Sequence, residues 1–307
     1  MNRMDRRHFL HAAAGSITVA LTGCASSAAG EHAPADDFER ANDELDLEPT
    51  PAVYRIGDAN APSVMLLHEL PGLTSEDLGT ARRLSQHGFA VYVPLMFGSI
   101  GQDNVPLGYF QACARANFVC GKRATRSPIQ DWLAELFEAI GRRSQLPVGA
   151  IGMCLTGSFP LALLGAGAQA AVVCQPTVPF TALFFRPVGD EKSDLGTSDA
   201  DLACALKSTV PILAMRFAND RLCPPERLAA LQARFGARVA IATLQEHGHS
   251  TLARDCHPDA FADTVQYLRV RLGLQPGPTP MRVARLAGRR CEIAAAGWRS
   301  IEPAPTR

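Results

Sequence analysis

Cys154 lies where an apolar run gives way to small residues, in the stretch VGAIGMCLTGSF at residues 148–159. Residues 147–153 have the composition of a buried strand, and residues 156–164 that of a short helix. A side chain on the sharp turn between a strand and a helix is exposed as a nucleophile would need to be. The alternative is that Cys154 is a small core residue, because free cysteines are often fully buried.

Three further polar residues follow apolar segments elsewhere in the chain. Glu69 ends the segment SVMLLHE, Asp220 comes after PILAMRF, and His249 comes after VAIATL. In an open parallel sheet, ligands collect at the carboxyl ends of the strands. We therefore expect Cys154, Asp220 and His249 to meet there, in the chain order nucleophile, acid and histidine.

These residue types are suited to acyl transfer. A protonated thiol is a poor nucleophile, and His249 can take its proton and later return it to a leaving group. Asp220 would fix the tautomer of His249 and stabilise its charged form. The helix N-terminus after Cys154 favours a thiolate, and the backbone N–H groups of Leu155 and Leu70 are the expected oxyanion donors.

The elements that must position these residues alternate along the chain. Apolar strands are predicted at 63–69, 89–97, 147–153, 170–176, 210–217 and 239–244. Helices are predicted at 75–88, 129–143, 156–164, 225–236 and 258–272. Strands that are apolar throughout and alternate with helices indicate an α/β fold, in which a mostly parallel sheet is covered on both faces. We expect one domain over residues 51–275, with an irregular insert at 98–128 lying over the site.

The N-terminal 24 residues read as an export signal. Arg6 and Arg7 precede a modest apolar stretch at residues 9–22, which is too short to span a membrane stably. The paired arginines resemble a twin-arginine signal, and LTGC at residues 21–24 resembles a lipobox. We expect Cys24 to be lipidated, which would make the protein an exported, periplasmic or membrane-anchored lipoprotein. Cleavage a few residues later, without lipidation, is the alternative.

Both flanks of the predicted domain look unstructured. Residues 25–50 hold Ala, Ser, Pro and surplus acidic residues, which predicts a flexible tether. Residues 276–307 begin Gly-Pro rich and end arginine rich, and are expected to form a loose tail with a helix at residues 283–298.

Composition excludes some functions. The chain has 307 residues with 30 basic and 30 acidic side chains, and this balance argues against a nucleic-acid partner. The nine cysteines form no CxxC pair and have no Cys/His ligand spacing, which argues against a zinc site. We expect no metal and no organic cofactor.

Four short motifs together resemble the dienelactone hydrolase family. They are HELPGL, GMCLTG, the loop around Asp220 and GHS, and the resemblance spans residues 50–275. It implies a single-domain α/β-hydrolase fold and lactone or ester substrates. The GHS motif favours His249 over the neighbouring His247 as the base. The family's signature is similar to G-x-C-x-G-G, and Thr156 stands here in place of a glycine.

The resemblance also implies roles for other side chains. Glu69 would lie near the resting thiol and help to activate it. Family members that accept dienelactone bind its carboxylate with arginines, for which Arg254, Arg123 and Arg126 are the candidates here.

The sequence thus predicts a monomeric thiol hydrolase that cleaves a small ester or lactone through an acyl-thioester. One alternative is a binding lipoprotein that has kept the fold without catalysis. Another is redox chemistry between Cys154 and Cys223 or Cys174.

Overall fold

The computed structural model describes residues 35–48, 51–114, 127–178, 187, 189–274, 284–286, 289–294 and 297–301. Cys24, Arg123 and Arg126 lie outside these residues, and so does the predicted export signal.

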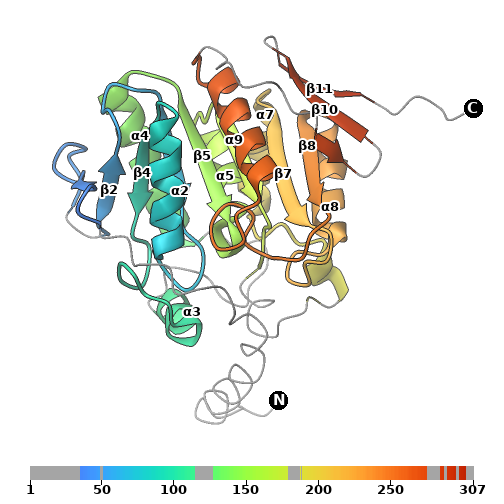
Figure 1. Cartoon of the computed structure of the whole chain (residues 1–307), viewed down its shortest axis with the longest axis horizontal. Helices are drawn as coiled ribbons and strands as arrows, with labels where there is room; N and C mark the ends of the chain where they lie inside the picture. Colours follow the sequence, from blue (N-terminus) through green and yellow to red (C-terminus); the bar gives the residue numbers. More distant parts are fainter. Residues whose placement is uncertain are drawn as a thin grey trace, which may run out of the picture.

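An eight-stranded sheet forms the centre of the molecule, in the order β1-β2-β4-β3-β5-β6-β7-β8 (Figure 1). Its strands are β1 (Glu39–Arg40), β2 (Val53–Ile56), β3 (Ser63–Leu67), β4 (Ala90–Pro94), β5 (Val148–Met153), β6 (Ala170–Cys174), β7 (Ile212–Phe217) and β8 (Val239–Leu244). Strands β3 to β8 are parallel, whereas β1 and β2 pair antiparallel at one edge. The predicted α/β class with a mostly parallel sheet in one domain is confirmed.

Helices cover both faces of the sheet, as continuously apolar strands require. One face carries α2 (Ser75–Gln86) and α9 (Pro258–Arg271), and the other carries α4 (Pro128–Ser144), α5 (Phe159–Gly165), α7 (Asp199–Lys207) and α8 (Pro225–Phe235). Alternate residues of each strand point to opposite faces. Thus Val64 and Leu66 of β3 pack with the first set of helices, while Met65 and Leu67 pack with the second.

The segment before β2 differs from the prediction. A flexible tether was expected over residues 25–50, but β1 pairs with β2, and Phe38, Ala41 and Leu45 are buried. The prediction is therefore wrong for residues 35–48. The low apolar content of this segment favoured a tether. However, a few well-placed apolar side chains are enough to hold a short segment against a sheet edge.

The insert at residues 98–128 contains a helix, α3 (Val105–Ala114), where irregular structure was expected. A Cβ atom on Gly108 would lie 1.9 Å from the carbonyl oxygen of Pro71. Glycine therefore lets α3 pack directly on the loop that follows β3.

The C-terminal segment forms strands rather than the expected helix. Strands β9 (Ala284–Leu286), β10 (Arg289–Ala294) and β11 (Gly297–Ile301) pair antiparallel in a separate three-stranded sheet. The prediction of a loose tail is therefore wrong for the residues of these three strands.

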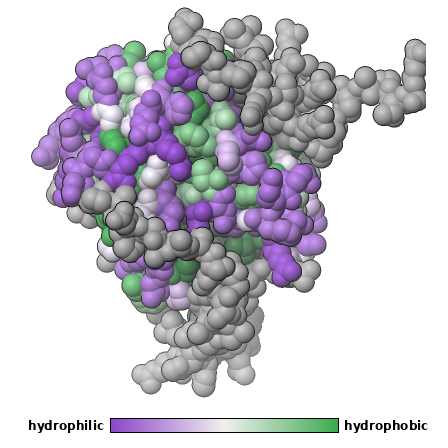
Figure 2. Space-filling view, in the orientation of Figure 1, coloured by the Kyte–Doolittle hydropathy of each residue, from purple (hydrophilic) through white to green (hydrophobic). Residues whose placement is uncertain are grey.

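On the face shown in Figure 2, hydrophilic residues flank a smaller apolar area. Within the described residues, no helix combines the length and the apolar character needed to cross a bilayer.

Candidate active site

Cys154 begins a sharp turn directly after β5. Its φ is 52°, in the left-handed region that non-glycine residues rarely adopt, and residues Cys154–Thr156 form a single 3₁₀ turn before α5. The flanking glycines are required sterically. A Cβ on Gly152 would lie 2.2 Å from the Thr156 carbonyl oxygen, and one on Gly157 would lie 2.6 Å from the Cα of Pro176. The small residues of the motif therefore allow this turn to form.

Thr156, which replaces a glycine of the family signature, braces the turn. Its hydroxyl oxygen accepts a hydrogen bond from the Met153 N–H at 3.1 Å. The same hydroxyl faces the carbonyl oxygens of Met153, Leu67 and His68 at 3.0, 3.2 and 3.3 Å. The Thr156 hydroxyl thus ties the turn to the end of β3.

Asp220 and His249 are in direct contact. The His249 Nδ1 lies 2.8 Å from Asp220 Oδ2, and the carboxylate side chain is only 1% exposed. The other carboxylate oxygen, Oδ1, accepts hydrogen bonds from the N–H groups of Leu222 and Cys223 at 2.8 and 3.2 Å. Buried Arg216 donates to three backbone carbonyls of this loop, including that of Asp220. The carboxylate is thus fixed in position on the Nδ1 side of the ring.

The loop after β8 presents His249. Asp255 Oδ2 accepts hydrogen bonds from the N–H groups of His249 and Ser250 at 2.8 and 3.0 Å. Burial lowers the pKa of His249, but Asp220 and the Cys154 sulfur outweigh it, so the pKa is raised well above its usual value. His247, the rival base, is exposed, whereas His249 contacts Asp220.

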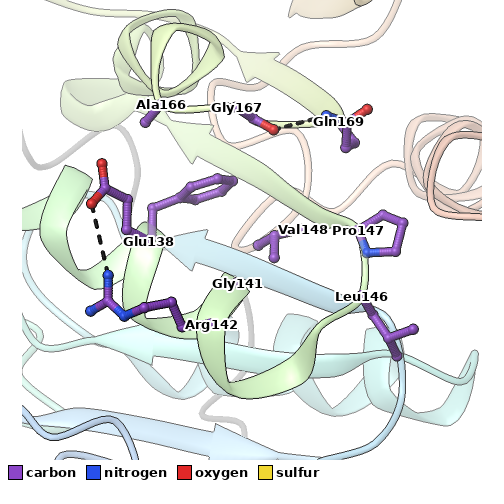
Figure 3. A pocket seen from close by; sticks show the side chains of 10 residues that line it. Glu138, Gly141, Arg142, Leu146, Pro147, Val148, Ala166, Gly167 and Gln169 are labelled. Atoms are coloured by element: carbon purple, nitrogen blue, oxygen red, sulfur yellow. Dashed lines mark hydrogen bonds and ion pairs between the residues drawn. The ribbon is translucent and has the colours of Figure 1, made fainter.

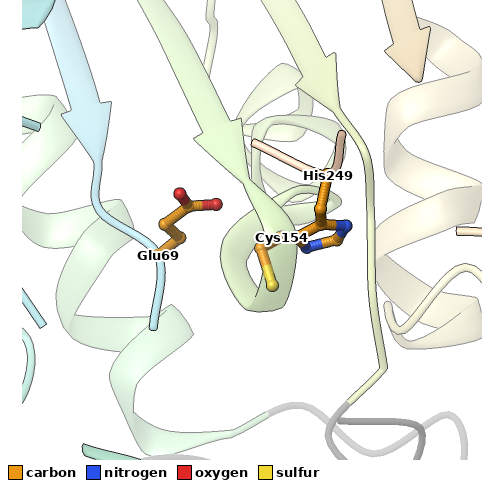
Figure 4. A group of neighbouring side chains, drawn as sticks. All are labelled: Glu69, Cys154 and His249. Carbon is orange, nitrogen blue, oxygen red and sulfur yellow. The ribbon is translucent and has the colours of Figure 1, made fainter. Parts of the chain in front are cut away.

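The side chains of Cys154, His249 and Glu69 converge at the turn (Figure 4). The Cys154 Sγ, a ring nitrogen of His249 and a carboxylate oxygen of Glu69 all lie within 4.8 Å of one another. The Nε2 of His249 is buried and has no hydrogen-bond partner among the described residues. The structure thus brings four predicted residues together: three in this cluster, with Asp220 behind the histidine.

Glu69 is buried and accepts hydrogen bonds from two side chains that are distant from it in the sequence. Ser250 Oγ donates to its Oε1, and Gln175 Nε2 donates to its Oε2 at 3.2 Å. Gln175 in turn accepts hydrogen bonds from Thr251 through its Oε1. Burial raises the pKa of Glu69, although His249 and these hydrogen bonds oppose the shift. Gln175 directly follows β6, so the strand-end criterion applied to the other residues would have found it.

His68 fixes the backbone beside Glu69. Its Nε2 accepts a hydrogen bond from the Met96 N–H at 3.1 Å, so Nδ1 carries the proton and donates to the Glu69 carbonyl at 3.1 Å. Full burial lowers the pKa of His68 to about 4 and keeps the ring neutral. Leu70, a predicted oxyanion donor, comes directly after Glu69, whose carbonyl group His68 holds. Leu155, the other predicted donor, follows Cys154 in the 3₁₀ turn.

The predicted carboxylate-binding residue Arg254 already has an anionic partner. Its Nη2 lies 2.5 Å from Asp103 Oδ1 in the loop before α3. The other two arginine candidates lie outside the described residues.

The cluster in Figure 4 could in principle receive a metal ion, since catalytic zinc sites use three protein ligands. The donor set fits such an ion poorly. Both carboxylate oxygens of Glu69 already accept hydrogen bonds, from Ser250 and Gln175, which a metal ion would have to displace.

The cysteines proposed as redox partners are free thiols in the core. Cys174 and Cys223 are fully buried, and burial raises the pKa of both. Because the thiolate is the reactive form, these two residues are poorly suited to disulfide exchange.

A parallel sheet covered on both faces, with a turn after β5 that presents a nucleophilic side chain, defines an α/β-hydrolase. The family model described as "Dienelactone hydrolase family" matches residues 52–268, and the chain belongs to this family. Family membership makes the protein a hydrolase with a small-molecule substrate. A search of curated proteins found no match.

Solved structures share the fold at low sequence identity. A putative dienelactone hydrolase from Klebsiella pneumoniae is 16% identical with a TM-score of 0.52, covering 72% of this chain and 92% of that one. TT1662 from Thermus thermophilus is also 16% identical, with a TM-score of 0.50, covering 76% and 97%. These similarities extend to the fold alone.

Proposed function

We propose that the protein hydrolyses an ester or lactone through Cys154, His249 and Asp220. The thiolate of Cys154 attacks the carbonyl carbon, and the charged His249 then donates its proton to the leaving alcohol oxygen as the carbon–oxygen bond breaks. This leaves an acyl-thioester and a neutral imidazole. His249 next takes a proton from water, hydroxide attacks the thioester, and the acid leaves as the thiolate returns.

Asp220 supports both steps by stabilising the charged imidazole, consistent with the raised pKa of His249. The tetrahedral intermediates carry an oxyanion, for which we propose the N–H groups of Leu155 and Leu70 as donors. The first is next to the nucleophile, and the second lies in the loop that His68 anchors.

Glu69 is proposed as an additional base in the resting site. Because burial raises its pKa, the Glu69 carboxylate in its ionised form accepts a proton more readily than an exposed carboxylate would. One of its oxygens lies within 4.8 Å of the sulfur, so both it and His249 are close enough to influence the thiol proton.

The observation that supports this proposal most strongly is the convergence of Cys154 Sγ with His249, whose other ring nitrogen is held by Asp220. The test is hydrolysis of p-nitrophenyl acetate and a panel of simple lactones. We expect Cys154→Ala to abolish turnover, iodoacetamide to inactivate the wild type, and an acyl adduct on Cys154 to be trapped by mass spectrometry. Turnover unaffected by Cys154→Ala would refute the mechanism, and a well-folded protein without turnover would indicate a binding module.

We further propose that the protein is exported and anchored through a lipid on Cys24. Support comes from the paired Arg6 and Arg7 and from LTGC at residues 21–24. Labelled palmitate should be incorporated into the wild type in cells and not into Cys24→Ala, and the wild type should fractionate with membranes. A soluble, unlabelled wild type would contradict the anchor.

A further inference from the structure

Arg254 is linked to the catalytic cluster through the loop that carries His249. The Arg254 N–H donates to Ser250 Oγ at 3.0 Å, and Ser250 Oγ donates to the Glu69 carboxylate. The backbone of Arg254 is therefore separated from Glu69 by a single hydrogen-bonded serine, and its guanidinium is near enough for its charge to lower the pKa of Glu69. Its side chain is 35% exposed, so it lies at the rim of the site rather than in the core.

Asp103, the partner of Arg254, lies in a loop that is hydrogen-bonded to the segment following β3. Gln102 Nε2 donates to the carbonyl oxygen of Pro71 at 2.9 Å, and the Gly101 N–H donates to that of Leu73 at 2.9 Å. These bonds hold the Asp103 loop to the segment after β3 that contains Glu69 and Leu70. The ion pair of Asp103 and Arg254 thus connects the two loops that supply Glu69 and His249.

The charges around Arg254 are unfavourable to an anion. Asp103 is 67% exposed and bonded to the guanidinium at 2.5 Å. Glu76 and Glu69 also act on Arg254, since all three acidic groups raise its pKa while burial opposes them. A negatively charged group that approached this rim would meet a cation already neutralised and carboxylates next to it.

We propose that Asp103 is a specificity-determining residue that excludes substrates with a carboxylate near the scissile carbonyl. The substrate class is then an uncharged ester or lactone. In the free protein Asp103 is paired with the Arg254 guanidinium. An anionic substrate would have to displace the Asp103 carboxylate from this pair and would be repelled by its charge. This inference rests on the proposed ester or lactone hydrolysis.

The test compares two esters of equal length, p-nitrophenyl butyrate and mono-p-nitrophenyl succinate, which carry a methyl and a carboxylate at the same position. The wild type should prefer the neutral ester in kcat/KM. In Asp103→Asn, the ratio of anionic to neutral kcat/KM should rise about three- to tenfold, because one charge near a partly exposed site is removed. The rise should shrink as salt increases.

Glu138→Gln is the matched control, since it removes the same charge elsewhere. Glu138 pairs with Arg142 at 3.9 Å in a hollow near the start of β5, at the opposite end of that strand from Cys154 (Figure 3). We expect the ratio of anionic to neutral kcat/KM in Glu138→Gln to equal that of the wild type. Arg254→Gln should leave the wild-type preference for the neutral ester intact.

The outcomes separate the two proposals. If Asp103→Asn and Arg254→Gln lower both rates equally without changing the ratio, the ion pair only holds the loops and the specificity role is overturned. The same conclusion follows if the wild type prefers the anionic ester. If Cys154→Ala still turns over the esters, the proposed mechanism itself fails, whatever the ratio.

Discussion

Cys154 is held in a conformation that it would not adopt without its neighbours. A non-glycine residue in the left-handed region costs about 1–3 kcal/mol, and it persists only where surrounding structure determines it. Here the carbonyl oxygen of Cys154 accepts hydrogen bonds from the N–H groups of Gly157 and Thr177 at 2.9 and 2.8 Å. The same strained region occurs at Gln175, at the end of the next strand. These two residues follow the neighbouring strands β5 and β6, where Cys154 and the Glu69 partner Gln175 lie.

Asp220 should matter more for catalysis than for folding. Replacing it with Asn keeps the side-chain shape but removes the charge that raises the pKa of His249. We expect Asp220→Asn to lower kcat for ester hydrolysis about 10²–10⁴-fold. The measurement is steady-state kinetics alongside a circular dichroism spectrum, and a variant with wild-type kcat would argue against the triad.

Asp77 should make stability depend on pH. Burial first, and then the nearby Glu69, raises its pKa from 3.8 to about 8. Between these values the folded state keeps a proton that the unfolded state has lost, so the free energy of unfolding falls as pH rises. We expect Asp77→Asn, which cannot titrate, to gain stability relative to the wild type across this interval and to show no further gain above it.

Urea unfolding at several pH values across that range measures the difference between Asp77→Asn and the wild type. Exposed Glu135 on α4 provides the control, and Glu135→Gln should track the wild type at every pH. A difference between Asp77→Asn and wild type that stays constant with pH would mean that Asp77 is ionised in the folded protein.

At the scale of elements, the turn between β5 and α5 depends on one hydroxyl group. Thr156→Val keeps the shape but leaves the Met153 N–H without its acceptor. We expect a loss of about 1–3 kcal/mol in the free energy of unfolding, as for other buried polar groups that lose a partner. Esterase activity should fall as well.

Thr156→Ser keeps the hydroxyl and is the matched variant. It should retain most of the activity that Thr156→Val loses, with stability measured by urea unfolding in both. Equal behaviour of the two variants would show that the hydroxyl does not hold the turn.

At the scale of the whole molecule, the domain begins before β2. Leu45 is buried in the main core, whereas a flexible tether would leave it exposed. We expect Leu45→Ala to lower the free energy of unfolding by about 2–5 kcal/mol, the usual cost of truncating a buried leucine. Asp43→Ala, at an exposed position in the same segment, should have little effect. Thermal unfolding of both variants tests this prediction. If the segment were a tether, neither substitution would change the stability.

The fold class and most of the strands could be predicted from the sequence, because buried parallel strands are apolar throughout and helices show their own period. The same pattern predicted which polar residues end the strands, and so the grouping of Cys154, Asp220 and His249. It missed β1, β2, α3, α7 and the C-terminal strands β9 to β11, whose segments are short or carry weak periodicity.

Only the tertiary structure showed how these residues are held. Contacts between loops distant in sequence, such as Ser250 with Glu69 or Arg254 with Asp103, leave no periodic pattern in the chain. They arise because a parallel sheet brings the ends of its strands to one edge, where loops of unrelated sequence meet. Residue types and order were therefore readable from the sequence, but partners and charge balance depended on which loops became neighbours.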